Sequence, residues 1–377
     1  MSGADEDSRL KALRARIDAL DEEIQRLVSE RAACAREIAE VKRAAGDGNA
    51  LYRPEREAEV LRRVVARNEG PLPDEALVRL FTELMSACRA VQGPVRVAYL
   101  GPEGTFTQEA ALRQFGGFAE LRPMEDIDAV FREVEAGGAD HGVVPVENSS
   151  EGVVTHTLDR MLASPLAICG EVELRVHHNL LAREEPVGAV RRVYAHQQAL
   201  AQCRRWLDEH LPHAERAAVA SNAEAARRAA QEAGAAAVAS EAAAGRYGLR
   251  VLARNIEDEP GNTTRFLVVG RQSPPPSGAD KTSLVLSARN EPGALFRLLE
   301  PLARHGISMT RIESRPARRG GLWEYVFFVD IEGHAEEPHV AAALAELERR
   351  ATLFRILGAY PRALRASDEP RPAGDGG

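Results

Sequence analysis

Residues 8–92 carry apolar side chains at a spacing near 3.5 residues, which is typical of helices with one hydrophobic face. The pattern predicts one helix over 10–42, about 50 Å long at ~1.5 Å per residue. A helix of that length is too long for a compact module of this size, so we expect a second copy of the chain to pack against it. The apolar positions are Leu10, Leu13, Ile17, Leu20, Ile24, Leu27, Cys34, Ile38 and Val41.

The rest of the chain divides into further modules. Two more helices are predicted after Pro54 and over about 74–92, and short β-like runs then alternate with helical stretches up to residue 270. A Pro/Ser/Gly-rich linker precedes a β-α-β-β pattern, which a helix over 336–350 and a strand near 353–357 complete as a ferredoxin-like βαββαβ domain. The expected domains are helical at 8–93, α/β at 95–271, a linker at 272–280, βαββαβ at 281–363 and a disordered tail at 364–377.

Composition and charge limit the partners. A net charge of −8 over 377 residues creates no field that attracts nucleic acid or an anionic membrane. No apolar run reaches the ~18 residues of a membrane span, and the acidic N-terminus does not resemble a signal peptide. The four cysteines form no C-x-x-C pair, and no metal-binding cluster is visible. We expect a cytoplasmic protein without a metal, cofactor, nucleic-acid or membrane partner.

Charged residues interrupt the apolar stripe, that is, the row of apolar residues along one face of the predicted helix over 10–42. Arg31 falls where the next apolar residue should lie, Lys42 follows about three turns later on nearly the same face, and Arg14 borders the stripe. The second helix repeats this pattern with Arg56 and Glu57. Because an unpaired buried charge costs several kcal/mol, several cations with one glutamate indicate a pocket for a small dianion. The alternative interpretation of any single residue is that its side chain lies at the edge of the apolar face and extends its charge into solvent.

The segments LRARIDALDEEIQRLVSERAACAREIAEVK, YRPERE and LFTELMSACRAVQ resemble the all-helical chorismate mutase family. The resemblance implies an intertwined dimer that converts chorismate to prephenate, a pericyclic step that needs orientation and fixed cations rather than a nucleophile. Cys88 stands where many members have serine, and Arg53 lies near a position that some fill with aspartate. The resemblance implies that Arg14 reaches the other protomer's site and that the remaining substrate ligands are Arg31, Lys42, Arg56, Glu57, Cys88 and Gln92.

Polar residues lie at the ends of several predicted strands of the central module, and Thr264 and Arg265 lead into a strand predicted over 266–269. Each could be a helix cap or a turn, and Thr107 is the expected cap of the helix after the first strand. Ligands bind beyond the ends of strands in α/β sheets, so five such strand ends together indicate a cleft. The residues at these ends are Thr105, Glu147, Asn148, Ser149, His196, Gln198, Ser221, Asn222, Thr264 and Arg265.

The motifs GPEGTFT, PVENS, HQQAL, SNAEAA, YGL and TTRF, in this order, resemble prephenate dehydratase over 95–270. The resemblance implies two α/β lobes with a cleft, like type II periplasmic binding proteins, in which prephenate loses CO₂ and its ring hydroxyl to give phenylpyruvate. Thr264 of the TRF motif would donate a proton or orient the substrate, beside Phe266. Arg265 would pair a substrate carboxylate or instead fix the loop by a salt bridge. The cleft would be lined by Thr105, Asn148, Ser149, Ser221, Asn222, His196 and Gln198, with Glu147 paired or protonated, and Ala195 replaces a common serine.

The motifs EPGALF and IESRP resemble the phenylalanine-binding ACT domain of the dehydratase family. The resemblance implies that two such domains pair edge to edge, with phenylalanine bound at their interface as a feedback inhibitor. RNA binding is disfavoured, because the strands carry no aromatic pair of the kind that stacks on bases. The expected effector residues are Asn290, Gly293, Ala294, Leu295, Glu313, Ser314 and Arg315.

Together the three modules resemble the bifunctional P-protein family, with chorismate and prephenate as substrates, phenylalanine as effector, and a homodimer or homotetramer as the assembly. One alternative is a ligand sensor without turnover, against which the intact TTRF motif argues. Another is an enzyme whose helical module only dimerises, against which the retained charges argue. A dehydrogenase is disfavoured because no dinucleotide fingerprint is present.

Overall fold

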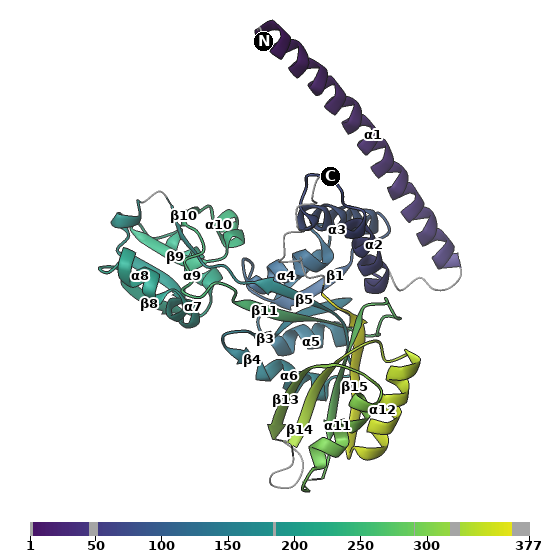
Figure 1. Ribbon diagram of the computed structural model, residues 1–377. Coiled ribbons are helices and arrows are strands. Elements are labelled where there is room, and N and C mark those ends of the chain that lie inside the picture. The colour runs from purple at the N-terminus through teal and green to yellow at the C-terminus, as the bar shows by residue number, and fades with distance from the viewer. Residues whose placement is uncertain (1–2, 45–51, 184–185, 290, 317–324, 364–377) are drawn as a thin grey trace, which may run out of the picture.

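The computed structural model describes residues 3–44, 52–183, 186–289, 291–316 and 325–363. Its first helix, α1, is 42 residues long and projects away from the rest of the chain (Figure 1). The apolar face of α1 is uncovered: Leu20 is 53% and Ile24 57% exposed, and among its described side chains only Ala39 is buried. An apolar face of this length needs a cover in water. The helices are α1 (Gly3–Ala44), α2 (Pro54–Ala66) and α3 (Asp74–Ala90).

The central module begins with a first lobe built on a mixed sheet of order β2-β1-β3-β11-β5, with β4 beside β3. Strand β1 is parallel to both neighbours, whereas β11 is antiparallel to both of its own. Helix α4 packs on one face through Phe115, and α5 and α6 pack on the other through Phe131 and Met161. The elements are β1 (Arg96–Leu100), α4 (Phe106–Phe115), β2 (Glu120–Met124), α5 (Ile127–Glu135), β3 (His141–Asn148), β4 (Gly152–Val153), α6 (Thr155–Ala163), β5 (Ala167–Arg175) and β11 (Thr263–Gly270).

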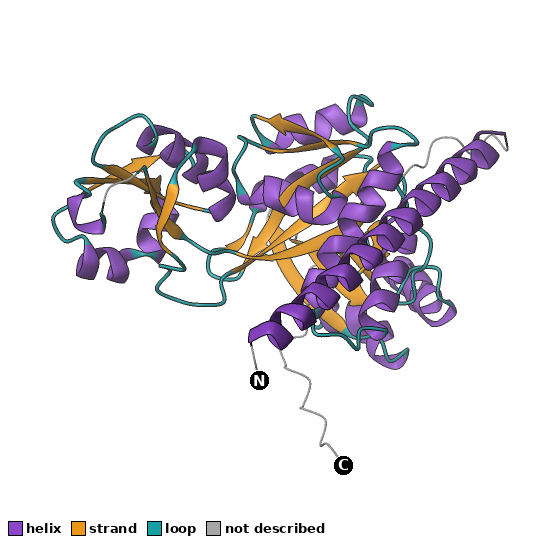
Figure 2. Ribbon diagram, turned by 90° about the horizontal axis from the view of Figure 1, so that it is seen from above, coloured by secondary structure: helices purple, strands orange, loops and turns teal. Residues whose placement is uncertain are grey.

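A second lobe, set apart from the first in both views, has the strand order β10-β6-β9-β7-β8 (Figures 1 and 2). Its strand β9 reads AAAVA and is buried along its whole length, as expected of a strand covered on both faces. The elements are β6 (Asn179–Ala182), the 3₁₀ turn η1 (Val187–Ala189), β7 (Arg192–His196), α7 (Gln197–Gln202), α8 (Arg204–His210), β8 (Glu215–Val219), α9 (Asn222–Ala229), β9 (Ala235–Ala239), α10 (Glu241–Tyr247) and β10 (Arg250–Ala253).

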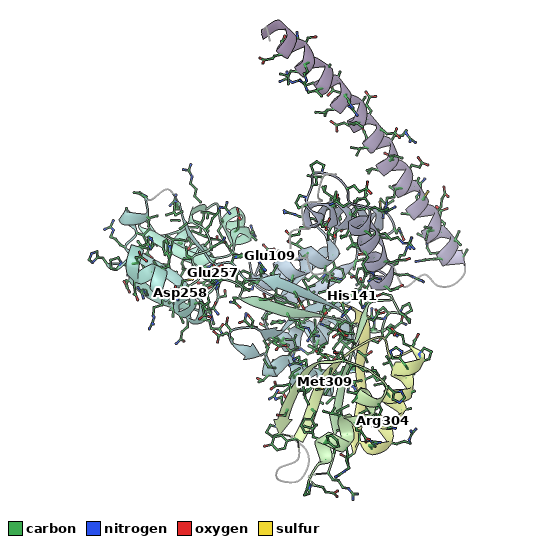
Figure 3. All side chains as sticks on the ribbon, viewed as in Figure 1. Glu109, His141, Glu257, Asp258, Arg304 and Met309 are labelled. Carbon is green, nitrogen blue, oxygen red and sulfur yellow. The ribbon has the colours of Figure 1, made fainter. Side chains whose placement is uncertain are left out.

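Two chain crossings join the lobes, one between β5 and β6 and one between β10 and β11. They are hydrogen-bonded to each other, because the Ile256 N–H donates to the His178 carbonyl and the Val176 N–H donates to the Asn262 carbonyl, both at 2.8 Å. Glu257, labelled in Figure 3, accepts a further hydrogen bond from the His178 N–H at 2.9 Å. The crossings therefore form one hydrogen-bonded connection between the lobes, which we call the hinge.

The C-terminal domain has the βαββαβ order that the sequence predicts, with strand order β13-β14-β12-β15. One face of its sheet carries α11 and α12, and the other packs on the first lobe, where Phe328 and Tyr360 share a core with Ile168. At Gly358 the backbones approach so closely that a Cβ would lie 2.3 Å from the Ile168 carbonyl oxygen. The elements are β12 (Asp280–Ser287), α11 (Ala294–Arg304), β13 (Met309–Pro316), β14 (Tyr325–Glu332), α12 (Pro338–Arg350) and β15 (Leu353–Pro361).

Two local expectations need correction. Helix α4 begins at Phe106, and its cap is Thr105 rather than Thr107, because the Thr105 hydroxyl accepts a hydrogen bond from the Gln108 N–H. Strand β11 already begins at Thr263, so the TTRF motif lies within a strand and not in a loop before it. The expected tail lies outside the described residues. None of the helices in the described ranges is long and apolar enough to cross a membrane.

Candidate active sites

A hydrogen-bond network lies at the ends of β3 and β11. The Asn148 side-chain N–H₂ donates to Thr264 Oγ1 and to Asn262 Oδ1, each at 2.8 Å. The amide is held in this orientation because its Oδ1 accepts from the backbone N–H groups of Ser150 and Glu151, each at 3.0 Å. Thr264 Oγ1 is therefore the acceptor towards Asn148, and its own proton is available to another group.

The network continues across the hinge to the second lobe. Asn262 donates to Gln202 Oε1 at 3.3 Å, and the same oxygen is 2.8 Å from His178 Nε2. Since an amide oxygen only accepts, His178 carries its proton on Nε2, and burial lowers the pKa of the ring. The sequence analysis missed His178 and Gln202, because neither lies in a motif that marks a strand end.

Most of the other predicted cleft residues cap or begin helices at strand ends. The Ser221 hydroxyl accepts from the Glu224 N–H at 3.1 Å, and the Asn222 side chain accepts from the His196 N–H at 2.8 Å. The His196 ring in turn accepts from the Gln198 N–H at 3.4 Å. Ser149 instead belongs to the network at β11, because its hydroxyl accepts a hydrogen bond from the Thr263 N–H at 3.0 Å and donates to Asn262 Oδ1 at 3.4 Å. Substrate contact stays a prediction for Thr105, Ser149, His196, Gln198, Ser221 and Asn222.

Three predicted cleft residues point elsewhere. Side chains alternate along a strand, so the neighbours of Thr264 and Asn148 face the opposite side of the sheet. There Arg265 is bound by Glu171 and Asp330, at 2.8 and 2.5 Å, and Glu147 is bound by Arg311 at 2.9 Å. Phe266, in turn, is 2% exposed in the core under α4. Arg265 and Glu147 are thus residues of the domain interface, and Phe266 is a core residue.

The predicted mutase residues do not converge within one chain. Arg14 is exposed in the N-terminal half of α1, and Arg31 and Lys42 are partly buried nearer the C-terminal end of that helix. Arg56 pairs with exposed Glu59 instead of facing a pocket. Cys88 is buried on α3, and Gln92 follows that helix at its end. A complete site would need further groups beside α2 and α3.

Glu57 has a partner that the sequence analysis missed. The buried guanidinium of Arg89 pairs with the Glu57 carboxylate and donates to the Phe115 carbonyl oxygen at 2.6 Å. It also lies 5.1 Å from the ring centroid of Tyr52, and burial lowers its pKa. Arg89 thereby connects the helical module to the first lobe. In the sequence, only its position next to Cys88 on the buried side of the predicted helix could have indicated this role.

A pocket of about 240 Å³ lies at the start of α11. Gly293 precedes the helix with φ +73°, a conformation that glycine adopts without strain. Arg315 is not part of this pocket, because it binds Asp159 at 2.9 Å in the first lobe. Glu313 and Ser314 lie on the edge strand β13 and not among the described lining residues, and Asn290 lies outside the described residues. The lining residues are Ala288, Arg289, Glu291, Gly293, Ala294, Leu295, Phe296, Tyr325 and Phe327.

Comparison with known proteins agrees with this division. Family models match residues 13–93 as chorismate mutase type II, 97–274 as prephenate dehydratase and 282–349 as an ACT domain. A bifunctional chorismate mutase/prephenate dehydratase of Stutzerimonas stutzeri is 54% identical over 97% of this chain and 100% of its own length, and one of Pseudomonas aeruginosa is 53% identical over 96% and 100%. The chain belongs to the bifunctional chorismate mutase/prephenate dehydratase family.

A solved relative also supports the architecture. The prephenate dehydratase of Arthrobacter aurescens, in complex with L-Phe, is 38% identical with a TM-score of 0.66, covering 73% of this chain and 92% of that chain. As a family member, the chain is an enzyme with a chorismate mutase and a prephenate dehydratase domain, followed by an ACT domain. The predicted family, fold class and pair of activities are therefore confirmed.

Proposed function

We propose that the dehydratase reaction takes place at Thr264, beside Asn148, between the two lobes. Loss of CO₂ breaks the carbon–carbon bond to the ring carboxylate, and its electrons complete the aromatic ring as the carbon–oxygen bond to the ring hydroxyl breaks. The departing oxygen needs a proton to leave as water. The observation that carries the assignment is the 2.8 Å hydrogen bond from Asn148 to Thr264 Oγ1, which leaves the threonine proton for the substrate.

This role is tested with prephenate as the only substrate. Thr264→Val keeps the shape and removes the proton, so phenylpyruvate formation should fall at least about 100-fold. Thr264→Ser keeps the hydroxyl and should retain activity within about tenfold of wild type. Equal activity of the Thr264→Val and wild-type enzymes would show that Thr264 is not the proton donor.

The chorismate mutase site, in this proposal, is completed by a second copy of the chain. The uncovered stripe of α1, with Leu13, Ile17 and Leu20 each about half-exposed, supports an intertwined dimer. In that dimer Arg14 of one chain would join Arg31, Lys42, Arg56, Cys88, Glu57 and Gln92 to form a cationic pocket for chorismate. We propose a cytoplasmic homodimer, in keeping with the four free cysteines.

Phenylalanine, we propose, binds at the pocket before α11 and lowers dehydratase activity. Backbone N–H groups at the start of a helix suit an amino-acid carboxylate, and Leu295, Phe296 and Phe327 supply apolar surface. The open edge of β13 would let two such domains pair, bringing Glu313 and Ser314 of one copy to the pocket of the other. Calorimetric titration with phenylalanine, which should show saturable binding abolished by Ala294→Trp, tests the site.

A further inference from the structure

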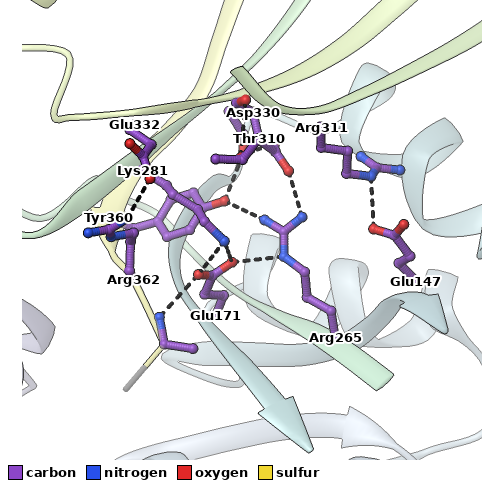
Figure 4. A network of polar contacts seen from close by, with 12 residues as sticks. Glu147, Glu171, Arg265, Lys281, Thr310, Arg311, Asp330, Glu332, Tyr360 and Arg362 are labelled. Carbon is purple, nitrogen blue, oxygen red and sulfur yellow. Dashed lines mark hydrogen bonds and ion pairs between the residues drawn. The ribbon is translucent and has the colours of Figure 1, made fainter. Parts of the chain in front are cut away.

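Four charged residues join the ACT domain to the first lobe through two ion pairs that lie side by side (Figure 4). Glu147 on β3 and Arg265 on β11 are paired in register, and Arg311 on β13 is likewise paired with Asp330 on β14. Arg311 binds Glu147 at 2.9 Å, and Asp330 binds Arg265 at 2.5 Å. The neighbouring strands β3 and β11 of the first lobe thus each bind one of the neighbouring strands β13 and β14 of the ACT domain through an ion pair. We name these four residues the charge clamp.

The two halves of the charge clamp differ in their surroundings. Asp330 and Arg265 are 6% and 11% exposed, and Arg265 also binds Glu171 and Tyr360, so this half is part of a larger buried network. Nearby charges hold the pKa of Asp330 below its usual value despite burial. Glu147 is 37% exposed and pairs with Arg311, whose side chain is 11% exposed. In the Glu147–Arg311 half only the carboxylate reaches solvent, so Glu147 is the member of the charge clamp that water can solvate if its ion pair opens.

The charge clamp lies directly behind the dehydratase network. Glu147 immediately precedes Asn148, Arg265 immediately follows Thr264, and Asn148 is itself in register with Thr264. Because neighbouring residues of a strand face opposite sides of the sheet, a pull on Glu147 from the ACT side moves the backbone that carries Asn148. The Asn148–Thr264 hydrogen bond, at 2.8 Å, is sensitive to a shift of a few tenths of an ångström.

The packing around the charge clamp is incomplete. A small cavity of about 10 Å³ lies between the domains, and Arg265, Arg311 and Asp330 line it together with apolar side chains. One guanidinium nitrogen of Arg311, Nη2, is buried without a hydrogen-bond partner among the described residues. Arg311 lies on β13, the edge strand of the ACT sheet, where a change in sheet pairing would act first.

We propose that Glu147 and Arg311 are positioning residues for the dehydratase reaction, and that the ion pair between them carries the state of the ACT domain to the Asn148–Thr264 pair. This inference rests on the proposed dehydratase and phenylalanine sites. When β13 moves, Glu147 moves with it, and the threonine hydroxyl loses the orientation set by Asn148. Effector binding and inhibition are then separable properties, because the pocket before α11 does not include Glu147.

The test uses the full-length enzyme with Glu147→Gln, Arg311→Gln and the charge swap Glu147→Arg/Arg311→Glu. The matched control is Arg355→Gln, which removes hydrogen bonds from ACT strand β15 to the carbonyls of Met161 and Leu162 on α6 and of Ser164, which follows that helix. None of these bonds involves β3 or β11. Each variant is assayed for dehydratase kcat and KM, for the phenylalanine concentration giving half-inhibition, and for phenylalanine affinity by calorimetry.

Both single variants should bind phenylalanine within about twofold of wild type while needing at least tenfold more for half-inhibition, with a change in kcat larger than that in KM. The swap should restore at least part of the inhibition, and Arg355→Gln should respond like wild type. Unchanged inhibition in both single variants, or an equal loss in Arg355→Gln, would overturn the inference. A wild-type enzyme without dehydratase activity or phenylalanine binding would instead refute the function on which the inference rests.

Discussion

Arg89 on α3 and Glu57 on α2 form a buried ion pair, with side chains 9% and 13% exposed. The same guanidinium donates to the Phe115 carbonyl oxygen at the end of α4, so one side chain serves both catalytic domains. A cation in this position fixes a carboxylate that the mutase resemblance assigns to substrate binding. The chorismate mutase and prephenate dehydratase domains are therefore joined through a single buried side chain.

Replacing Arg89 should destabilise the protein strongly. Arg89→Met leaves the Glu57 carboxylate buried and unpaired, and breaking such a pair typically costs about 3–5 kcal/mol. Urea denaturation measures this loss. The control is Arg63→Met, which breaks an exposed pair with Glu59 and should cost no more than about 1 kcal/mol. Similar losses in the two variants would show that the buried pair contributes no special stability.

The exposed stripe of α1 predicts that one substitution separates the two activities. Leu20→Asp places a charge on the face that a second copy would cover, so the chain should become monomeric and mutase activity should fall at least about 100-fold. Dehydratase activity should stay within about threefold. Light scattering with both assays measures this, and Glu22→Gln, on the opposite side of α1, is the control. A dimeric or mutase-active Leu20→Asp variant would contradict the proposed assembly.

The elements that follow from the spacing of apolar residues could be predicted from the sequence. The spacing of the apolar residues placed the C-terminal end of α1 within two residues, although the helix begins seven residues before the predicted position 10. The order of short strands and helices predicted the ferredoxin-like domain. The polar strand ends led to Asn148 and Thr264, which the structure joins by a hydrogen bond. A local pattern of this kind reports which residues share an element.

These local sequence patterns do not show which part of the protein packs against a given face of a helix or sheet. Arg265 lies beside Thr264 in the TTRF motif, but its direction depends on strand alternation and on the ACT domain behind the sheet. Arg89 and His178 acquire their partners from segments at least 24 residues away. Such long-range contacts leave no periodic signal in one sequence, so the domain interface became visible only in three dimensions.

His141, labelled in Figure 3, should make stability depend on pH. Its ring contacts the rings of Tyr52 and Phe115, and burial lowers its pKa to about 4, below the ~6.5 of an unfolded chain. Between these values the unfolded chain binds the additional proton, so stability should fall as the pH drops from about 6.5 to 4, by at most ~1.4 kcal/mol per pH unit. Urea denaturation across this range should show a smaller slope for His141→Phe than for wild type. Replacement of exposed His213 by Gln should leave the slope unchanged, and an identical slope in His141→Phe would exclude this residue.

The close approach at Gly358 predicts a tight limit on side-chain size. A Cβ there would collide with the Ile168 backbone, so Gly358→Ala should push the ACT domain away from the first lobe and destabilise the protein by about 1–3 kcal/mol. The control is Gly188→Ala, where a Cβ meets nothing within 4 Å. Thermal unfolding distinguishes the two variants. A Gly358→Ala protein as stable as wild type would mean that the interface between the ACT domain and the first lobe can shift to accommodate a methyl group.

The central claim is that one chain carries two separate catalytic sites, and supplying chorismate alone tests it most directly. Purified wild-type enzyme should convert chorismate through prephenate to phenylpyruvate. Thr264→Val should consume chorismate at the wild-type rate and accumulate prephenate, because only the second site has lost its proton donor. Phenylpyruvate formation by Thr264→Val at the wild-type rate, or a parallel loss of chorismate consumption, would contradict the account.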